Sequence, residues 1–239
     1  MLPFRQKPQP STDWPQRFGE LARETRTDAI RRYYEQGVPV GETPLSQLPL
    51  VALDLETTGL DPKRHGIVSI GMVPFTLERV RPAAGYYRVI RPRREIDEHS
   101  ITIHQITHDE IDDAPDLEDI VDELLAALAG RVVVVHYHAI ERRFLYQGFL
   151  RRFGEGLLFP LIDTLAIEKQ ISQRTTLNPA TWFRNRRVSL RLADARRRYH
   201  LPEYSPHHAF TDALATAELF QAQVAYHGSP DDAVSEWWL

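Results

Sequence analysis

Apolar residues follow strand-like spacing in some stretches of this chain and helix-like spacing in others. Runs of β-branched, aliphatic and aromatic residues predict strands at 50–55, 67–75, 85–90, 131–136 and around 162–164. Apolar residues at helical spacing predict helices at 116–129, 139–153, 190–199 and 209–226. Three successive strands followed by strands that alternate with helices predict an α/β fold, in which a mixed five-stranded sheet has helices on both faces.

Another helix is predicted ahead of this region. Asp13 is a good capping residue, and Phe18, Leu21 and Tyr33 fall on one face of an amphipathic stretch from about Trp14 to Gln36. Glycines and prolines then form a linker. We therefore divide the chain into an N-terminal extension with its helix and linker (1–47), a main domain (48–228) and a C-terminal tail (229–239).

Short apolar segments at both borders of the main domain have alternative interpretations. Trp237 and Trp238 in the tail are unusual residues to leave in water, so we expect them to dock on the body of the protein or on a second subunit. The segment 47–50 resembles a short peptide that binds the sliding clamp of polymerases. It also leads directly into the first strand, which is the interpretation that we favour.

Composition narrows the chemistry available to the chain. The sequence is 42% hydrophobic and 26% charged over 239 residues, which suits one sizeable domain with a short appendage. Cysteine is absent, so disulfides and thiolate metal sites are excluded, and carboxylates and imidazoles are the available metal ligands. The chain has neither a secretory signal nor an apolar run of about 20 residues, so we expect a cytoplasmic protein.

Charge is unevenly distributed along the chain. The net charge is −4, which argues against a generic cationic coat for nucleic acid. Between Arg174 and Arg198, however, there are eight arginines and one acid, Asp194. Such a strip beside an acidic site suits an enzyme that grips phosphates near a strand end, although any single arginine on a helix is more often simply solvated.

The first candidate motif follows the first predicted strand. Residues i and i+2 of a strand share a face, so Asp54 and Glu56 project together. An Asp-x-Glu pair alone is weak evidence, because half-exposed strands often contain two acids. The segment after it, Thr57-Thr58-Gly59-Leu60, strengthens the case, since a glycine that can take a positive φ would present backbone amides beside the carboxylates.

Three further residues complete a possible catalytic set. Glu141 lies near the start of a predicted helix, and His207 precedes Asp212 by five positions, which places His207 on a loop and Asp212 in the first turn of a helix. Four converging carboxylates would repel one another unless divalent cations lay between them. A histidine nearby could take a proton from a metal-held water, which indicates a phosphodiester hydrolase.

Several motifs in a fixed order resemble those of the DEDDh exonucleases, the proofreading branch of the RNase H-like superfamily, over about residues 48–226. They are 54–60 (Asp-Leu-Glu-Thr-Thr-Gly-Leu), 103–107 (Ile-His-Gln-Ile-Thr), 136–145 with Glu141, and 207–213 with His207 and Asp212. The resemblance implies an RNase H-like fold and a 3′-to-5′ exonuclease that uses two Mg²⁺ or Mn²⁺ ions. It also implies that the substrates are 3′ ends of single-stranded DNA or RNA, and it suggests association with a DNA polymerase.

The resemblance assigns roles to positions of this sequence. Asp54 would bridge the two metals, Glu56 and Asp212 would bind the metal on the nucleophile side, Glu141 would serve the other metal, and His207 would be the general base. Residues implied to hold the terminal nucleotide are Thr57, Thr58, Gly59 and Leu60, with His104 and Ile106 on the opposite wall.

The chain departs from the family pattern at two positions of the second motif. Glu141 stands where the family usually has Asp, and Tyr137 stands where an Asn is common. Glutamate remains an oxygen ligand for Mg²⁺ or Mn²⁺, so we expect retained but retuned activity. A binding module or polymerase-associated module with weak catalysis is the alternative, and a metal-free scaffold is a third interpretation. The motifs do not distinguish DNA from RNA, and we favour DNA.

Overall fold

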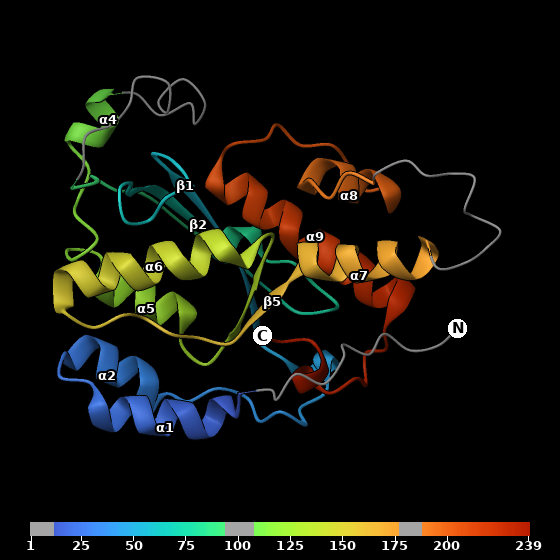
Figure 1. The fold of residues 1–239 in the computed structure, drawn as a ribbon, viewed down its shortest axis with the longest axis horizontal. Helices are drawn as coiled ribbons and strands as arrows, with labels where there is room; N and C mark the ends of the chain where they lie inside the picture. Colours follow the sequence, from blue (N-terminus) through green and yellow to red (C-terminus); the bar gives the residue numbers. More distant parts are fainter. Residues whose placement is uncertain (1–11, 94–107, 177–187) are drawn as a thin grey trace.

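The computed structural model describes residues 12–93, 108–176 and 188–239 (Figure 1). Five strands form one sheet in the order β3-β2-β1-β4-β5. The pairs β1/β2 and β2/β3 are antiparallel, whereas β1/β4 and β4/β5 are parallel. The strands are β1 (Leu50–Thr57), β2 (Ile67–Phe75), β3 (Tyr86–Val89), β4 (Val132–Val135) and β5 (Leu161–Asp163). This mixed sheet confirms the α/β fold expected from the sequence.

The central strands are the most apolar part of the chain. Leu50 to Leu53 in β1 are at most 1% exposed, and the four valines of β4 are fully buried. A parallel strand covered on both faces requires such a continuous apolar run, because neither face meets water. The core therefore surrounds β1 and β4 and places the polar end of β1 at a fixed position.

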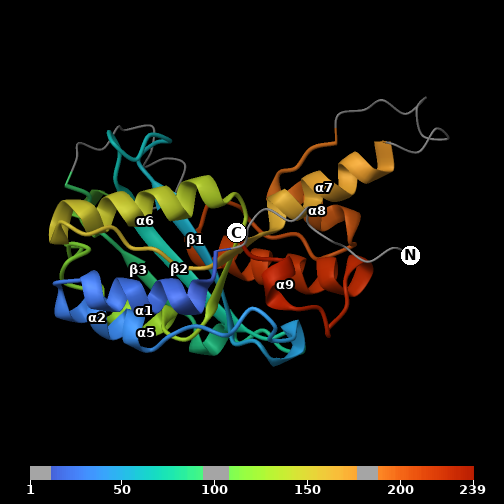
Figure 2. The ribbon, with the colours of Figure 1, turned by 60° about the horizontal axis from the view of Figure 1, so that its bottom comes forward.

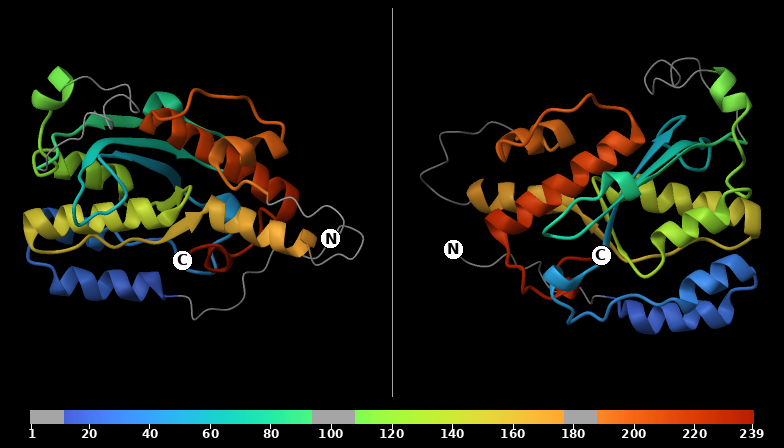
Figure 3. Two further views of the ribbon diagram at one scale, coloured as in Figure 1. Left: turned by 45° about the horizontal axis from the view of Figure 1, so that its top comes forward. Right: turned by 180° about the vertical axis from the view of Figure 1, so that it is seen from behind.

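Helices pack on this sheet. Both views of Figure 3 show α9 lying across the strands, and its contacts are mainly with β1 and β2, whereas α6 packs on β1 and β5. Predicted and observed ends differ by one or two residues for most helices, the usual uncertainty. The described helices of the domain are α4 (His108–Asp112), α5 (Val121–Leu128), α6 (His138–Phe153), α7 (Thr164–Thr176), α8 (Leu192–Arg198) and α9 (Ala209–His227).

Helix α5 starts five residues later than the prediction of 116–129. The Asp116 carboxylate accepts hydrogen bonds from Arg152 and Arg93 and from the backbone N–H of Glu118. These bonds accompany a turn at residues 117–120 in place of a regular helix. An aspartate that bonds local backbone competes with helix formation in this way.

The N-terminal extension is a pair of helices, so the prediction of one helix from Trp14 to Gln36 is wrong. The helices α1 (Trp14–Glu24) and α2 (Asp28–Glu35) are separated by extended backbone at Thr25 and Thr27. The break lets the Phe18 ring lie 5.5 Å from that of Tyr33. One straight helix would hold residues 15 positions apart at about 22 Å, at 1.5 Å per residue. Burial of this aromatic pair therefore favours two helices.

The extension and the tail share the apolar core of the main domain. Figure 2 shows α2 lying beside α5, and the backbone N–H of Leu158 donates to the Tyr34 hydroxyl at 3.0 Å. Trp237 and Trp238 are 0% and 4% exposed, so the tail docks on the body of the same chain. The domain boundaries at 47/48 and 228/229 stay a prediction.

Two further sequence expectations can be compared with the fold. Leu48 and Leu50 are buried in the core, whereas Gln47 and Pro49 are exposed, so both leucines of the segment 47–50 are used by the fold and not by a clamp-binding peptide. None of the helices in the described ranges is both long and apolar enough to cross a membrane.

Candidate active site

The carboxyl end of β1 places Asp54 and Glu56 on one face of the sheet. Asp54 pairs with Gly71 and Glu56 with Ser69 across the antiparallel neighbour β2. The register then shifts between Glu56 and Thr57, and Thr57, the last residue of β1, pairs with Ile67. The two acids are therefore held by a regular ladder up to the point at which the chain becomes a loop.

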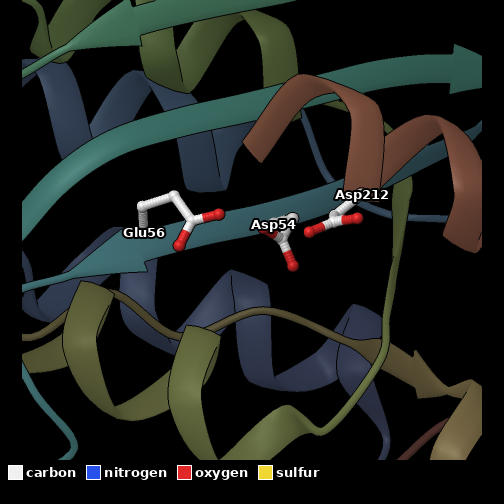
Figure 4. Close-up of side chains that lie close together, drawn as sticks. All are labelled: Asp54, Glu56 and Asp212. Atoms are coloured by element: carbon white, nitrogen blue, oxygen red, sulfur yellow. The ribbon is translucent and has the colours of Figure 1, made fainter. Parts of the chain in front are cut away.

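Gly71 of β2, which pairs with Asp54 of β1, allows the start of α9 to pack closely on the sheet. A Cβ atom at Gly71 would lie 2.2 Å from the carbonyl carbon of Ala209, so a side chain would push the helix away. This close packing brings Asp212, in the first turn of α9, toward Asp54 and Glu56 of β1. One carboxylate oxygen from each of Asp54, Glu56 and Asp212 lies within 4.8 Å of the other two, and Figure 4 shows the three side chains facing one another.

Burial and mutual repulsion shape the electrostatics of this cluster. Burial raises the pKa of Asp54 well above its usual range, and the charges of Glu141, Glu56 and Asp212 raise it further. Burial also raises the pKa of Asp212, with Glu56 adding to the shift, while the His207 backbone N–H opposes it. Carboxylates in this arrangement are poorly stabilised as anions by the protein alone.

Glu141, in the first turn of α6, belongs to the same electrostatic group. It is 2% exposed, and its Oε2 has no hydrogen-bond partner within the described part of the chain. Burial raises the pKa of Glu141 well above its usual range, and the charge of Asp163 adds to the shift. A buried carboxylate oxygen without a donor is costly, unless a cation or a proton satisfies it.

Sequence reasoning missed Asp163, the last residue of β5. Its carboxylate accepts from the backbone N–H groups of Tyr137 and His138 at 3.0 and 3.1 Å and contacts His138 Nδ1 at 2.6 Å. Asp163 therefore fixes the turn from β4 into α6, and with it the position of Glu141. The only signal in the sequence was one acid at the end of a strand, which did not distinguish it from a surface residue.

His207 and His208 occupy different environments. His207 is exposed, has a left-handed φ of 68°, and its backbone N–H donates to Asp212 Oδ2 at 2.9 Å. His208 stacks on Tyr87 of β3 with ring centroids 4.7 Å apart. The structure thus places His207 on the loop before α9, as expected from its spacing to Asp212, with its ring outside the core.

The loop after β1 is arranged differently from the expectation. Thr57 Oγ1 donates to the carbonyl of Gly59, and the backbone N–H of Thr58 already donates to the carbonyl of Gly66. Gly59 does not have a positive φ, so that expectation is wrong. A Cβ atom at Gly59 would lie 2.2 Å from the His65 ring, so a larger residue there would require that ring to move. Leu60 is 80% exposed at the tip of the loop.

His104 and Ile106 lie outside the described residues. Three arginines of the predicted basic strip lie in α8 and have internal partners: Arg196 is buried and donates to Glu218, Arg197 pairs with Asp194, and Arg198 pairs with Glu168. Arg196 and Arg198 join α8 to α9 and α7, whereas the exposed Arg197 pairs with an acid of its own helix. The two inter-helix pairs give no support to the expectation of a phosphate-binding strip.

Comparison with known proteins shows which family the chain belongs to. The family model RNase_T, described as exonuclease, matches residues 51–220 and so covers β1, Glu141 and Asp212. The chain belongs to this exonuclease family. It is 30% identical over 170 residues to a DNA polymerase III PolC-type protein of Thermotoga petrophila, covering 71% of this chain but 11% of that protein's length.

Two other proteins show how far the similarity extends along the chain. The DNA polymerase III subunit epsilon of Treponema pallidum is 27% identical over 176 residues, which cover 74% of this chain and 76% of that protein. The nuclease domain of 3′hExo, a DEDDh family member bound to rAMP, superposes with a TM-score of 0.60 at 14% identity and covers 76% of this chain and 94% of that one. The RNase H-like fold and the resemblance to DEDDh exonucleases are thereby confirmed.

Proposed function

We propose that this chain is a metal-dependent 3′-to-5′ exonuclease that releases nucleoside 5′-monophosphates from single-stranded ends, with DNA as the favoured substrate. One observation supports it above all: carboxylates from β1 and α9 converge to within 4.8 Å beside the buried Glu141. Neighbouring anions with raised pKa values, at a site that also contains an unpartnered carboxylate oxygen, suit divalent cations.

Two Mg²⁺ or Mn²⁺ ions would be held by Asp54, Glu56, Glu141 and Asp212. When bound, such ions polarise the phosphate and increase the acidity of water. His207, on its exposed loop, accepts the proton of the attacking water. Thr57 to Leu60 hold the terminal nucleotide, with the exposed Leu60 side chain against its base. The contacts of His104 and Ile106 with the terminal nucleotide remain a prediction.

The relatives support DNA as the substrate and a polymerase as the partner. Both named relatives are DNA polymerase III proteins or subunits, so we propose association with a DNA polymerase. The structural neighbour is bound to rAMP, so RNA is the alternative substrate to be tested. Cytoplasmic location stays a prediction.

The alternative is a nucleic-acid-binding or polymerase-associated module with weak catalysis, and the unusual Glu141 favours it. The burial of Glu141 beside three other acids argues against it, since a binding module gains nothing from such repulsion.

A digestion experiment separates the two functions. Single-stranded DNA, duplex DNA and a short RNA, each labelled at the 5′ end in one series and at the 3′ end in another, are incubated with Mg²⁺, Mn²⁺ or EDTA. The proposal expects a ladder from the 5′-labelled single strand and immediate release of a labelled mononucleotide from the 3′ label, with neither in EDTA. Asp212→Asn is the control for a contaminating nuclease. Binding without metal-dependent cleavage would establish the alternative.

A further inference from the structure

Tyr137, between β4 and α6, combines an unfavourable backbone with an exposed ring. Its φ of 92° and ψ of 73° lie in the left-handed region, which a residue with a Cβ atom and a large side chain rarely adopts. Its side chain is also 48% exposed, so the fold does not use the ring as core. Glycine or asparagine would fit this backbone with less strain.

The surrounding structure maintains this conformation through the backbone alone. Asp163 accepts the backbone N–H of Tyr137 and that of His138, and the Tyr137 carbonyl accepts from the N–H of Ile140 in the first turn of α6. None of these bonds depends on the phenol ring. Strain that the scaffold enforces at a residue whose side chain is left in solvent is a pattern associated with functional sites.

The position of Tyr137 places it beside the carboxylate cluster. Ala52 of β1 pairs with Val134 of β4 in a parallel register, and β4 ends one residue later, so Tyr137 follows the carboxyl end of the strand next to the one that bears Asp54. Glu141, whose charge acts on Asp54, follows four residues later. That separation is about 6 Å along a helix. Tyr137 and the carboxylates therefore lie at the same end of neighbouring parallel strands.

We propose that the Tyr137 ring is the stacking platform for the nucleobase next to the 3′-terminal nucleotide. The inference rests on the proposed exonuclease function. The scissile phosphate lies between the terminal nucleoside and its neighbour, so the two bases extend to different sides of the carboxylates. Leu60 lies beyond Glu56 along the chain of β1, whereas Tyr137 lies on the β4 side. With the terminal base on Leu60, the neighbouring base stacks on Tyr137, as bases do on exposed aromatic rings in single-strand-binding proteins.

Four forms of the full chain test this: the native protein, Tyr137→Phe, Tyr137→Asn and Tyr137→Gly. Each is assayed on a single-stranded DNA with all bases present, and on strands with one abasic site at the terminal, second or third position from the 3′ end. Each is also assayed on the p-nitrophenyl ester of thymidine 5′-monophosphate, which has no second nucleoside. Thermal melting reports on the fold.

Base–aromatic stacking predicts a loss in kcat/KM of about tenfold when the native protein meets the second-position abasic site. Tyr137→Asn and Tyr137→Gly should show the same loss on the intact strand and no additional loss from that abasic site. Tyr137→Phe should match the native protein, and all variants should hydrolyse the ester equally. Melting temperatures of the Asn and Gly variants should be unchanged or higher, because the backbone strain is relieved.

Three outcomes would overturn the inference. Equal losses on the ester and the strand would assign Tyr137 a structural role in positioning Glu141. Additive losses from Tyr137→Asn and the second abasic site would show that ring and base do not interact. If the Tyr137 substitutions interact only with an abasic site at the terminal or third position, the ring does not stack on the second base. Failure of the native chain to cleave any substrate would instead overturn the proposed function itself.

Discussion

The backbone N–H of His207 donates to Asp212 Oδ2 at 2.9 Å, so a carboxylate of the acidic cluster also holds the loop of the candidate general base. The bond uses the main chain of His207 and leaves its imidazole outside. Because φ at His207 is 68°, the loop turns back at this residue and directs the next one, His208, onto Tyr87. Substituting each histidine alone therefore tests its contribution separately.

Replacing His207 with Asn should remove the general base and preserve the loop. Asparagine tolerates a left-handed backbone and retains the N–H that bonds to Asp212. We expect kcat to fall by a factor on the order of 10² to 10⁴, with Mn²⁺ affinity almost unchanged, because a general base does not ligate the ion. Single-turnover rates measure the first quantity and titration calorimetry the second.

His208→Ala is the matched control for this substitution. It removes the ring that stacks on Tyr87, so we expect a lower melting temperature and only a small change in rate. Equal losses of rate in the two variants would remove His207 from the mechanism, as would a large loss of Mn²⁺ affinity in His207→Asn.

The parts of the site that the sequence predicted depend on short spacings. Asp54 and Glu56 share a strand face, and His207 and Asp212 lie on either side of a helix start, so local geometry was enough to place each pair on its element. The resemblance to the family was needed to group the two pairs with Glu141. Asp163, Gly71 and the left-handed Tyr137 act through contacts with residues that are distant in sequence, or through backbone conformations that no spacing reveals. The break between α1 and α2 was missed for a similar reason, since it depends on tertiary packing of Phe18.

Neutralising Asp54 should stabilise the metal-free protein. Its folded pKa is raised by burial and by neighbouring carboxylates, so the native state binds more protons than the unfolded chain. That stability is fully present below the ordinary value of 3.8 and is lost as pH rises through the folded pKa. Asp54→Asn removes the loss, by about 1.4 kcal/mol for each unit by which the pKa is raised.

The experiment measures unfolding by denaturant in EDTA from pH 4 to pH 7 for both proteins. The advantage of Asp54→Asn should grow as pH rises, and it should shrink or reverse with saturating Mg²⁺ or Mn²⁺, which stabilise only a chain that binds them. Identical stability at every pH would show that the carboxylates are solvated and apart.

Glu141 should tolerate shortening better than neutralisation. Glu141→Asp preserves the charge, so we expect retained activity with a changed preference between Mg²⁺ and Mn²⁺. Glu141→Gln preserves the shape and removes the charge, so activity should fall at least about 10²-fold, as for loss of a group that stabilises charge in the transition state. Initial rates at matched concentrations of each metal test both expectations.

Glu123→Gln provides the comparison for Glu141, because Glu123 is also an acid in the first turn of a helix but is exposed. It should leave the rate unchanged and lower stability by roughly 0.3–1 kcal/mol at most. A fully active Glu141→Gln enzyme would show that Glu141, like Glu123, is only an acid at a helix start and has no role in catalysis.

Asp163→Asn should destabilise the protein, with the opposite pH dependence to Asp54→Asn. Burial alone would raise the pKa of Asp163, but hydrogen bonds from the His138 ring and from the N–H groups of Tyr137 and His138 outweigh it and lower the pKa. The stability that this carboxylate contributes is therefore present above its ordinary value of 3.8 and is lost as pH falls through the lower folded value.

At pH 7 we expect Asp163→Asn to cost about 1.5–3 kcal/mol, the range for a hydrogen bond to a charged group, since an amide cannot accept all of these donors with both of its heavy atoms. Activity should fall as well, because the turn that positions Glu141 loosens. The exposed Asp231→Asn is the control and should change stability by less than about 0.5 kcal/mol. The decisive measurement is the difference in unfolding free energy between native and Asp163→Asn proteins at pH 7 and at pH 3. A difference that is the same at both values would show that the charge of Asp163 does not hold the turn.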